Sequence, residues 1–420
     1  MIGISKLYCG TVEPSDVLRY GARGATLPSH LLQFAADKKP VVVWNCTRRC
    51  NLRCVHCYSQ SADVSYSGEM TTDEGYAMLE DLARFGAPVA LFSGGEPLIR
   101  PDLPDLIARA KQLGLRAVLS TNGTLIEPAT AERLGRIGLS YVGVSLDGMR
   151  PTNDKFRGMD GAFDRALAGI RNCIRAGVKV GLRFTIHRRN AADIPDIFRL
   201  LRDENIPRVC FYHLVYAGRG ASLIAEDLGH DATRRVVDLI IDRTVDLHAQ
   251  GLPKEVLTVD NHADGPYLYL RMVREGNPRA AKVMELLRMN RGNSSGNGIG
   301  CVSWDGTVHP DPFWRHVSLG NVRQRPFSRI WTDLSNPLLA RLKDKRPYVT
   351  GRCASCAFLD VCGGNFRVRA EAATGNLWAP DPACYLSDEE IAAVPSAPGP
   401  AGPRRDEQPA AAHPQPRGEE

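Results

Sequence analysis

The stretch VVVWNCTRRCNLRCVHCYS, residues 41–59, joins an apolar run to three closely spaced cysteines. The run at 41–45 is rich in β-branched residues and almost continuously apolar, which predicts a strand buried on both faces. Cys50, Cys54 and Cys57 come after this run, and no further cysteine follows until Cys173. The sequence therefore predicts a buried strand that carries three thiols just beyond its carboxyl end.

Five further runs of the same kind follow, at residues 89–93, 116–122, 141–147, 179–185 and 208–215. Amphipathic helical patterns separate most of them, and the first helix begins at a capping box formed by Thr71 and Glu74. Strands that alternate with helices predict an α/β fold with a parallel sheet and helices outside it. Six such units are fewer than a closed barrel needs, so we expect a partial (βα)6 TIM-like barrel with an open side.

The composition is that of a folded protein with ordinary charge content: 420 residues, 43% hydrophobic residues and a formal charge of +6. No apolar run approaches the roughly 20 residues that a membrane span requires, and the spread-out charge does not favour nucleic acid as a partner. The N-terminus lacks a secretory pattern, so we expect a cytoplasmic protein without a membrane partner. Its twelve cysteines are then metal ligands or buried thiols rather than disulfides.

Polar motifs end several of the predicted strands, where barrel enzymes carry their working residues. They are SGGEP at 93–97, STNG at 120–123 and SLDG at 145–148. Glycines allow the backbone to approach a ligand closely, and the carboxylate of Glu96 can accept a hydrogen bond from an ammonium group. Taken alone, each motif is also typical of an ordinary turn. Arg183, inside an apolar strand, forms either a buried ion pair or a contact to a bound carboxylate.

Three thiols without a fourth favour an iron–sulfur cluster over zinc. A 4Fe-4S cluster needs four ligands, so three cysteines leave one iron open to another molecule. The alternative is a structural zinc site, which usually has four ligands in paired CxxC spacing.

A second group of cysteines lies near the C-terminus: Cys353, Cys356, Cys362 and Cys384. Four thiols can complete a closed 4Fe-4S cluster, and they suit structural zinc equally well. Four other cysteines have no partner at ligand spacing, and we expect them to be buried thiols: Cys9, Cys46, Cys173 and Cys210.

The CxxxCxxC pattern followed by an aromatic residue, with SGGEP one strand later, resembles the signature of radical S-adenosylmethionine enzymes. The resemblance implies a 4Fe-4S cluster held by Cys50, Cys54 and Cys57, with S-adenosylmethionine at the open iron. It also implies a ferredoxin or flavodoxin as electron donor and a 5'-deoxyadenosyl radical that abstracts hydrogen from the substrate. The implied contacts to S-adenosylmethionine are Tyr58, Gly94, Gly95, Glu96, Ser120, Asn122, Ser145, Asp147 and Arg183.

The C-terminal part resembles the SPASM extension of these enzymes, through Cys301 before WDGTVHPD, the stretch LGNVRQRPFSRIW and the second cysteine group. This resemblance implies an auxiliary 4Fe-4S cluster held by that group. The extension usually carries two clusters, but Asp311 and Phe366 occupy positions where two ligands of the first would fall. We therefore expect a single auxiliary cluster, with Cys301 either a buried thiol or a residue near the substrate.

Residues 8–391 resemble more closely the radical enzymes that modify siroheme-derived tetrapyrroles, through stretches such as VDNHADGPYLYLR and RGNSSGNGIGC. One branch removes two acetate side chains from 12,18-didecarboxysiroheme to give iron-coproporphyrin III, and another removes propionates on the way to heme d1. The first branch is the interpretation we favour. Two other classes stay open: a peptide-modifying SPASM enzyme and a non-catalytic iron–sulfur scaffold.

A substrate that is an iron tetrapyrrole with several carboxylates is expected to contact arginine and histidine. Candidates for the carboxylates are Arg219, Arg315, Arg367 and Arg369, and candidates for the iron are His213, His262, His309 and His316. For each of these, an ordinary surface or core position is the alternative.

The chain is expected to divide into five segments. They are an N-terminal extension (1–38), the barrel (39–225), a bridging helical region (226–299), the SPASM-like domain (300–392) and a disordered tail (393–420). The tail is expected to be disordered because its proline, alanine and charged residues cannot bury enough apolar surface.

Overall fold

The computed structural model describes residues 1–12, 16 and 39–392. The predicted tail and most of the predicted N-terminal extension lie outside these residues. No helix of the described part is long and apolar enough to cross a membrane.

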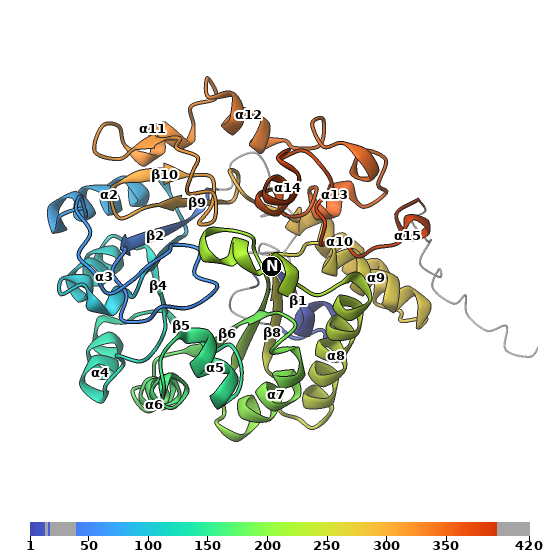
Figure 1. The fold of residues 1–420 in the computed structure, drawn as a ribbon, viewed down its shortest axis with the longest axis horizontal. Helices are drawn as coiled ribbons and strands as arrows, with labels where there is room; N and C mark the ends of the chain where they lie inside the picture. The colour runs from blue at the N-terminus through green and yellow to red at the C-terminus, as the bar shows by residue number, and fades with distance from the viewer. Residues whose placement is uncertain (13–15, 17–38, 393–420) are drawn as a thin grey trace, which may run out of the picture.

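A run of parallel strands forms the centre of one curved sheet (Figure 1). Its members are β2 (Val41–Thr47), β3 (Val89–Gly94), β4 (Arg116–Thr121), β5 (Tyr141–Ser145), β6 (Val180–Ile186), β7 (Arg208–His213) and β8 (Glu255–Val259). Each pairs in parallel with the next along the chain, as the strand–helix alternation predicts. The predicted class, a partial barrel of the α/β type, is confirmed.

Helices cover the outer face of this sheet (Figure 1). They are α2 (Thr72–Phe85), α3 (Leu103–Gln112), α4 (Pro128–Ile137), α5 (Arg150–Arg157), α6 (Ala162–Arg175), α7 (Ile194–Asp203) and α8 (His230–Ala249). Short helical turns join them to the strands: η4 (Pro97–Ile99), η5 (Ala191–Asp193) and η6 (Gly218–Glu226). The predicted capping box is present, since the Thr71 side chain accepts from Glu74 N–H and the Glu74 carboxylate accepts from Thr71 N–H. The helix thus begins where the sequence predicts.

The sheet is larger than the sequence predicts. Strand β8 lies inside the region expected to be helical and adds a further parallel strand beside β7. At its other side, β1 (Ile2–Gly3) pairs antiparallel with β8, followed by the π-helical turn η1 (Ser5–Cys9). The first residues of the chain are therefore part of the sheet.

The C-terminal region extends the same sheet from the opposite edge. Strand β9 (Ile299–Val302) pairs in parallel with β2, and β10 (Thr307–His309) and β11 (Gly320–Asn321) continue from it as antiparallel strands. One sheet includes strands from the predicted barrel, the predicted bridging region and the predicted SPASM-like domain. The predicted segment boundaries at residues 225 and 299 therefore do not coincide with breaks in the sheet and stay predictions.

Short helices complete the C-terminal half, above and to the right of the barrel in Figure 1. They are α9 (Asp264–Arg274), α10 (Ala280–Asn290), α11 (Phe327–Trp331), α12 (Pro337–Lys343), η7 (Gly351–Cys353), α13 (Leu359–Cys362), α14 (Arg367–Thr374) and α15 (Asp388–Ala392). Most of the apolar core belongs to one cluster that includes Trp44 of β2 and Trp331 of α11. The two halves therefore share a core as well as a sheet.

Candidate active site

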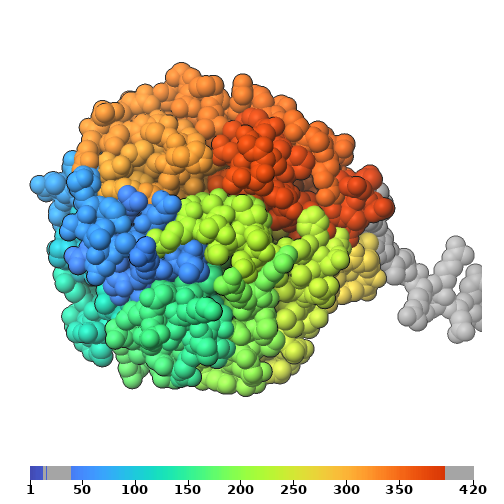
Figure 2. Space-filling model, in the orientation of Figure 1, coloured from blue at the N-terminus to red at the C-terminus, as the bar shows by residue number. Residues whose placement is uncertain are grey.

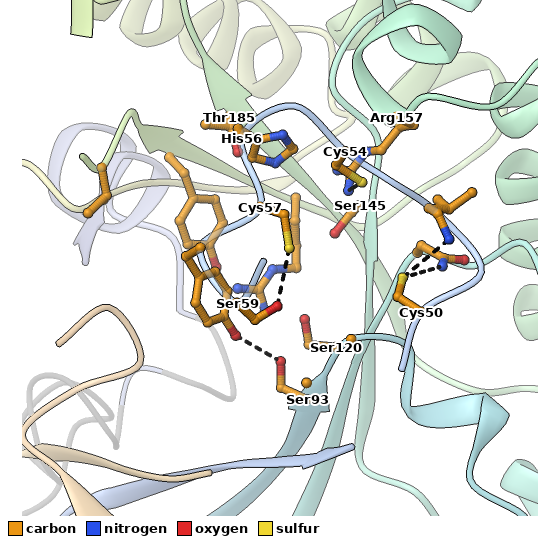
Figure 3. A pocket seen from close by; sticks show the side chains of 18 of the residues that line it. Cys50, Cys54, His56, Cys57, Ser59, Ser93, Ser120, Ser145, Arg157 and Thr185 are labelled. Carbon is orange, nitrogen blue, oxygen red and sulfur yellow. Dashed lines mark hydrogen bonds between the residues drawn. The ribbon is translucent and has the colours of Figure 1, made fainter. Parts of the chain in front are cut away.

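A cavity opens at the carboxyl ends of the parallel strands, beside the loop that follows β2 (Figure 3). Its wall includes Ser93 from β3, Ser120 from β4, Ser145 from β5 and His213 from β7. Parallel strands of a barrel present their carboxyl ends at one face, so motifs far apart in the sequence meet there. The polar strand ends noted in the sequence thus surround a single cavity.

Cys50, Cys54 and Cys57 all line this cavity. Arg219 binds the backbone of the cysteine loop: its Nε donates to the Cys54 carbonyl at 2.8 Å, and its Nη1 donates to the Ser61 carbonyl at 3.0 Å. The neighbouring Gly218 has φ +57°, and a Cβ there would lie 2.3 Å from the Tyr58 carbonyl oxygen. This segment therefore packs directly on the cysteine loop, as the contact between the blue and yellow-green surfaces in Figure 2 shows.

A buried ion pair stands behind Cys54. The Arg157 guanidinium pairs with the Asp147 carboxylate, and its Nη1 lies 3.6 Å from the Cys54 sulfur. His56 Nε2 is 3.5 Å from the same carboxylate, but burial lowers the pKa of this imidazole to about 4. The cation near Cys54 at neutral pH is therefore Arg157, with Asp147 as its counter-ion.

The three thiols sit in different electrostatic surroundings. Burial raises the pKa of Cys50 to about 12 and also raises that of Cys54. For Cys57 burial acts in the same direction, but the Ser59 hydroxyl, backbone N–H groups and Arg219 outweigh it and lower its pKa. No three cysteine, histidine or acidic side chains of the described residues already converge at metal-ligand spacing. The donor set nonetheless fits an iron–sulfur cluster, because three thiols face one cavity and a buried cation offsets the charge of their thiolates.

Two of the predicted contacts to S-adenosylmethionine do not line the cavity. Glu96 is completely buried, and its carboxylate accepts hydrogen bonds from the Thr121 hydroxyl and from the N–H groups of Asn122 and Leu98. Asp147 is also completely buried, paired with Arg157 and accepting from Thr185 N–H. Direct contact of either carboxylate with S-adenosylmethionine stays a prediction, and in this structure the hydrogen bonds of both carboxylates hold the surrounding loops.

The remaining predicted contacts do line the cavity: Tyr58, Gly94, Gly95, Ser120, Asn122, Ser145 and Arg183. Gly94 has φ +140°, and a Cβ there would stand 2.2 Å from the Thr47 carbonyl oxygen, so this turn must be glycine. Arg183 has no ion pair within the described part of the chain and packs 4.8 Å above the Tyr212 ring. The alternative of a buried ion pair for Arg183 therefore finds no support.

Most of the arginines proposed for substrate carboxylates have other partners. Arg367 is fully buried and donates to the carbonyls of Gly364, Leu377 and Ala379. Arg369, also fully buried, pairs with Asp381 at 3.0 Å. Contact of these two residues with the substrate stays a prediction, and in this structure their N–H groups bind partners inside the protein. Arg219 and Arg315 bind the backbone of the cysteine loop, although Nη2 of Arg219 and Nε of Arg315 are buried without a partner.

His213 is the one candidate histidine of the four that lines the cavity. His309 is buried, and its two ring nitrogens are hydrogen-bonded to the Ser303 hydroxyl and the Val317 carbonyl, so its contact with the substrate stays a prediction. His316 is largely exposed beside Glu371, and His262 is buried away from the cavity wall.

The second cysteine group does not line the cavity. Cys353 and Cys362 lie on η7 and α13, and Cys384 lies in the segment before α15. Burial raises the pKa of the Cys362 thiol, and the neighbouring thiols of Cys384, Cys356 and Cys353 raise it further, which brings the four into one electrostatic group. Four thiols in one group fit a closed cluster.

The positions expected for another cluster are occupied otherwise. Asp311 is buried and accepts from the Ser295 hydroxyl and from the N–H groups of Phe313 and Trp314. Phe366 packs edge-on against Phe313, with ring centroids 5.5 Å apart. Cys301 is fully buried and accepts from the Asn45 side chain at 3.4 Å. Of the two interpretations of Cys301, the buried thiol agrees with this position.

Sequence reasoning missed several residues of the cavity wall: Arg157, Thr185, Tyr212, Asp260 and Phe313. Asp260 could have been found from the sequence. EVLTVDN at 255–261 is an apolar run that ends in polar residues, as YVGVSLD at 141–147 is. Arg157 at the end of α5 and Phe313 in a turn after β10 have no such pattern.

Comparison with known proteins agrees with this geometry. The model of the radical SAM superfamily matches residues 44–201, and the model of SPASM, an iron–sulfur cluster-binding domain, matches residues 296–357. These families imply a 4Fe-4S cluster that binds S-adenosylmethionine and auxiliary iron–sulfur ligation. In structure, the chain is similar to Streptococcus suis SuiB bound to S-adenosylmethionine, with a TM-score of 0.66 and 18% identity over 83% of this chain and 78% of that one. This likeness establishes the fold alone.

The relatives that match most of the chain include two tetrapyrrole synthases. Fe-coproporphyrin III synthase of Methanosarcina barkeri is 66% identical over 93% of this chain and 99% of the relative. Pre-heme d1 synthase of Dinoroseobacter shibae is 46% identical over 84% of this chain and 87% of the relative. With three cysteines at the mouth of a partial barrel and a four-cysteine group beyond it, this chain belongs to the radical SAM superfamily, among the SPASM-containing enzymes that include Fe-coproporphyrin III synthase and pre-heme d1 synthase.

Proposed function

We propose that this chain forms Fe-coproporphyrin III by removing two acetate side chains from 12,18-didecarboxysiroheme. The observation that carries the proposal is the 66% identity to a Fe-coproporphyrin III synthase over nearly the whole of that relative. The cavity is compatible with the substrate, because its wall combines arginines with aromatic rings. Aromatic side chains suit a flat macrocycle, and guanidinium groups suit its carboxylates.

Cys50, Cys54 and Cys57 would hold the cluster that binds S-adenosylmethionine, and the second cysteine group would hold the auxiliary cluster. When bound, the first cluster and S-adenosylmethionine supply the hydrogen-abstracting radical. Arg157 stabilises the negative charge of the Cys54 thiolate, since its Nη1 lies 3.6 Å from the Cys54 sulfur and the side chain is itself buried. Tyr58, Asn122 and Ser145 contribute polar groups for the cofactor at the strand ends.

Arg183 is the residue proposed to bind a carboxylate inside the cavity. Within the described residues it forms no ion pair, although it is close enough to Asp260 to lower the pKa of that carboxyl group, and it lies on the cavity wall. A guanidinium in such a place gains a counter-ion when a carboxylate enters, and low local dielectric strengthens that pair. The carboxylate belongs either to S-adenosylmethionine or to the substrate.

Arg48 and Arg315 lie outside this wall, and both pack against the indole ring of Trp304. Their guanidinium carbons are 5.0 and 4.6 Å from the Trp304 centroid, and the Nε of each is buried without a partner. They offer further positive charge for a polycarboxylate substrate. A cytoplasmic location and a ferredoxin or flavodoxin donor complete the proposal, since a low-potential cluster requires a reducing partner.

The test is an anaerobic reaction of the reconstituted protein with 12,18-didecarboxysiroheme, S-adenosylmethionine and a reductant, followed by mass spectrometry. Loss of two acetates with all propionates retained is the expected result. Loss of propionates would instead support the pre-heme d1 activity, which the 46% identical relative makes the second candidate. Failure to cleave S-adenosylmethionine would refute an enzymatic role.

A further inference from the structure

Arg367 is a buried cation beside the second cysteine group. It is the first residue of α14, which follows α13 in the red part of Figure 1, and its side chain has no exposed surface. The guanidinium packs over Gly364, where a Cβ would lie 3.6 Å from the Arg367 Nε. Gly364 comes two positions after Cys362. The arginine therefore lies against the backbone that leaves this cysteine.

The contacts of Arg367 satisfy hydrogen bonds but leave its charge without a counter-ion. Its Nη1 donates to the carbonyls of Leu377 and Ala379 at 3.0 and 2.7 Å, and its Nη2 donates to the Gly364 carbonyl. Its Nε is buried without a hydrogen-bond partner, and among the described residues the guanidinium forms no ion pair. A buried charge in a protein is normally paired with an opposite charge.

The charged side chains nearby do not supply this counter-ion. Asp381 is already paired with Arg369 at 3.0 Å, and neither side chain of that pair has exposed surface. Lys345 is another buried cation, which donates to the Asn293 carbonyl at 3.1 Å. Burial and the charge of Arg367 lower the pKa of its ammonium group to about 7. Arg367 therefore needs an anion from another source.

The second cysteine group is the source that lies within electrostatic reach. Burial lowers the pKa of Arg367, whereas Asp381 and the thiols of Cys353, Cys362 and Cys384 act in the opposite direction. A 4Fe-4S core bound by four thiolates is an anion, and its one-electron reduction adds a further negative charge. Such a cluster supplies the charge that Arg367 lacks.

We propose that Arg367 is the buried counter-ion of the auxiliary cluster and raises its reduction potential. The inference rests on the proposed binding of this cluster by the second cysteine group, and not on which tetrapyrrole is the substrate. One electron from a low-potential donor converts the oxidised cluster to the more negative reduced cluster. A buried cation stabilises the reduced form more than the oxidised form, and net charge is one of the features that set cluster potentials.

The test is a redox titration of the reconstituted full chain with dithionite, followed by electron paramagnetic resonance. Added S-adenosylmethionine identifies the signal of the first cluster, because only that cluster has an open iron. Arg367→Gln removes the charge and keeps an amide that can donate to the carbonyls. It should lower the potential of the auxiliary cluster by about 59 mV or more, the one-electron equivalent of a tenfold change in the ratio of reduced to oxidised cluster. Arg367→Lys keeps the charge, so its potential should stay closer to that of the wild type.

Arg352→Gln is the matched control. Burial raises the pKa of the Cys356 and Cys384 thiols, and Arg352 acts in the opposite direction, so this arginine also lies near the group. Its side chain is partly exposed and already paired with Asp388 at 3.0 Å. Solvent screens such a pair, and the potential should therefore change less than in Arg367→Gln.

Iron content equal to that of the wild type shows that a variant is folded and holds both clusters. Equal potentials for the wild type and Arg367→Gln would overturn the inference, as would equal shifts for Arg367→Gln and Arg367→Lys. Loss of the auxiliary cluster from both variants would also overturn it, whereas loss from Arg367→Gln alone would support a need for the charge. A wild-type chain that holds no second cluster would instead contradict the proposed ligand set. The proposed function is judged separately, by the mass of the tetrapyrrole product.

Discussion

The two cysteine groups differ in what surrounds them. Cys50, Cys54 and Cys57 line a cavity among polar strand ends, whereas the four C-terminal cysteines lie outside it, around η7 and α13. Each group has a buried arginine nearby: Arg157 beside Cys54, and Arg367 close enough to affect the pKa of Cys353. The comparison indicates that the group with three cysteine ligands is the one open to a small molecule, and the group with four is not. Three thiols face a space that a small molecule can enter, and four are placed where none needs to.

Removing one thiol from the cavity group should have the largest effect. Cys54→Ala would leave two ligands for the first cluster, so cleavage of S-adenosylmethionine should be abolished. Product analysis for 5'-deoxyadenosine measures this directly. Retained cleavage would contradict the assignment of Cys54 as a ligand of the first cluster. Cys173→Ala is the control, because Cys173 is buried and does not line the cavity.

The same change in the C-terminal group should separate the two roles. Cys362→Ala should lower the iron content from about eight to about four atoms per chain, because one cluster of four irons is lost. Cleavage of S-adenosylmethionine should persist, since this thiol does not line the cavity. Iron analysis and 5'-deoxyadenosine formation measure the two outcomes, and loss of both would contradict the independence of the groups.

The two buried arginines should differ in their effect on stability. Arg157→Gln leaves the Asp147 carboxylate buried without its cation, which should lower the free energy of unfolding by about 3–5 kcal/mol. Among the described residues Arg367 forms hydrogen bonds with backbone carbonyls and no ion pair, so Arg367→Gln should cost less, about 1–3 kcal/mol. Chemical denaturation under anaerobic conditions measures both.

Arg49→Gln is the control for these two variants, because Arg49 forms an exposed pair with Asp63. Such a pair contributes less than about 1 kcal/mol. A loss for Arg367→Gln as large as that for Arg157→Gln would contradict the distinction between a paired charge and a set of carbonyl contacts.

Asp260 gives the cavity a pH dependence. Burial raises the pKa of its carboxyl group to about 6, while Arg369 acts in the opposite direction. The unfolded carboxyl titrates near its ordinary pKa of about 4. Between these values the folded state binds more protons, so its stability is greatest at low pH and falls as pH rises toward 6, by about 2–3 kcal/mol in total. Asp260→Asn should remove this decline, which denaturation at a series of pH values measures. An unchanged pH profile would contradict it.

Much of the fold follows from local patterns in the sequence. The six apolar runs became β2 to β7, because parallel strands buried on both faces need continuous apolar residues. Strand β8 was missed because EVLTV is short and begins with a glutamate, which is buried here beside Arg208. The pairing of β9 with β2 could not be predicted, since it joins residues about 260 positions apart in the sequence and depends on the shape of the finished barrel.

The site follows the same division. Residues within a motif, such as the three cysteines and Ser120, lie where the strand pattern implies. Glu96 and Asp147 belong to the strand-end motifs SGGEP and SLDG, but their side chains are buried away from the cavity. Each carboxylate accepts a backbone hydrogen bond that the sequence does not reveal. Arg157 pairs with Asp147, which follows β5 directly before α5, and this contact depends on how the last turn of α5 packs against that strand end. Roles that depend on tertiary contacts were therefore the ones that sequence reasoning could not assign.

The shared sheet constrains how a bulky molecule can reach the cavity. β9 is hydrogen-bonded along β2, the very strand that leads into the cysteine loop, and β1 closes the opposite edge against β8. A hinge between the two halves would have to break the β9–β2 ladder. We therefore expect a large flat ligand to enter through movements of the surface turns around the opening rather than through separation of the two halves.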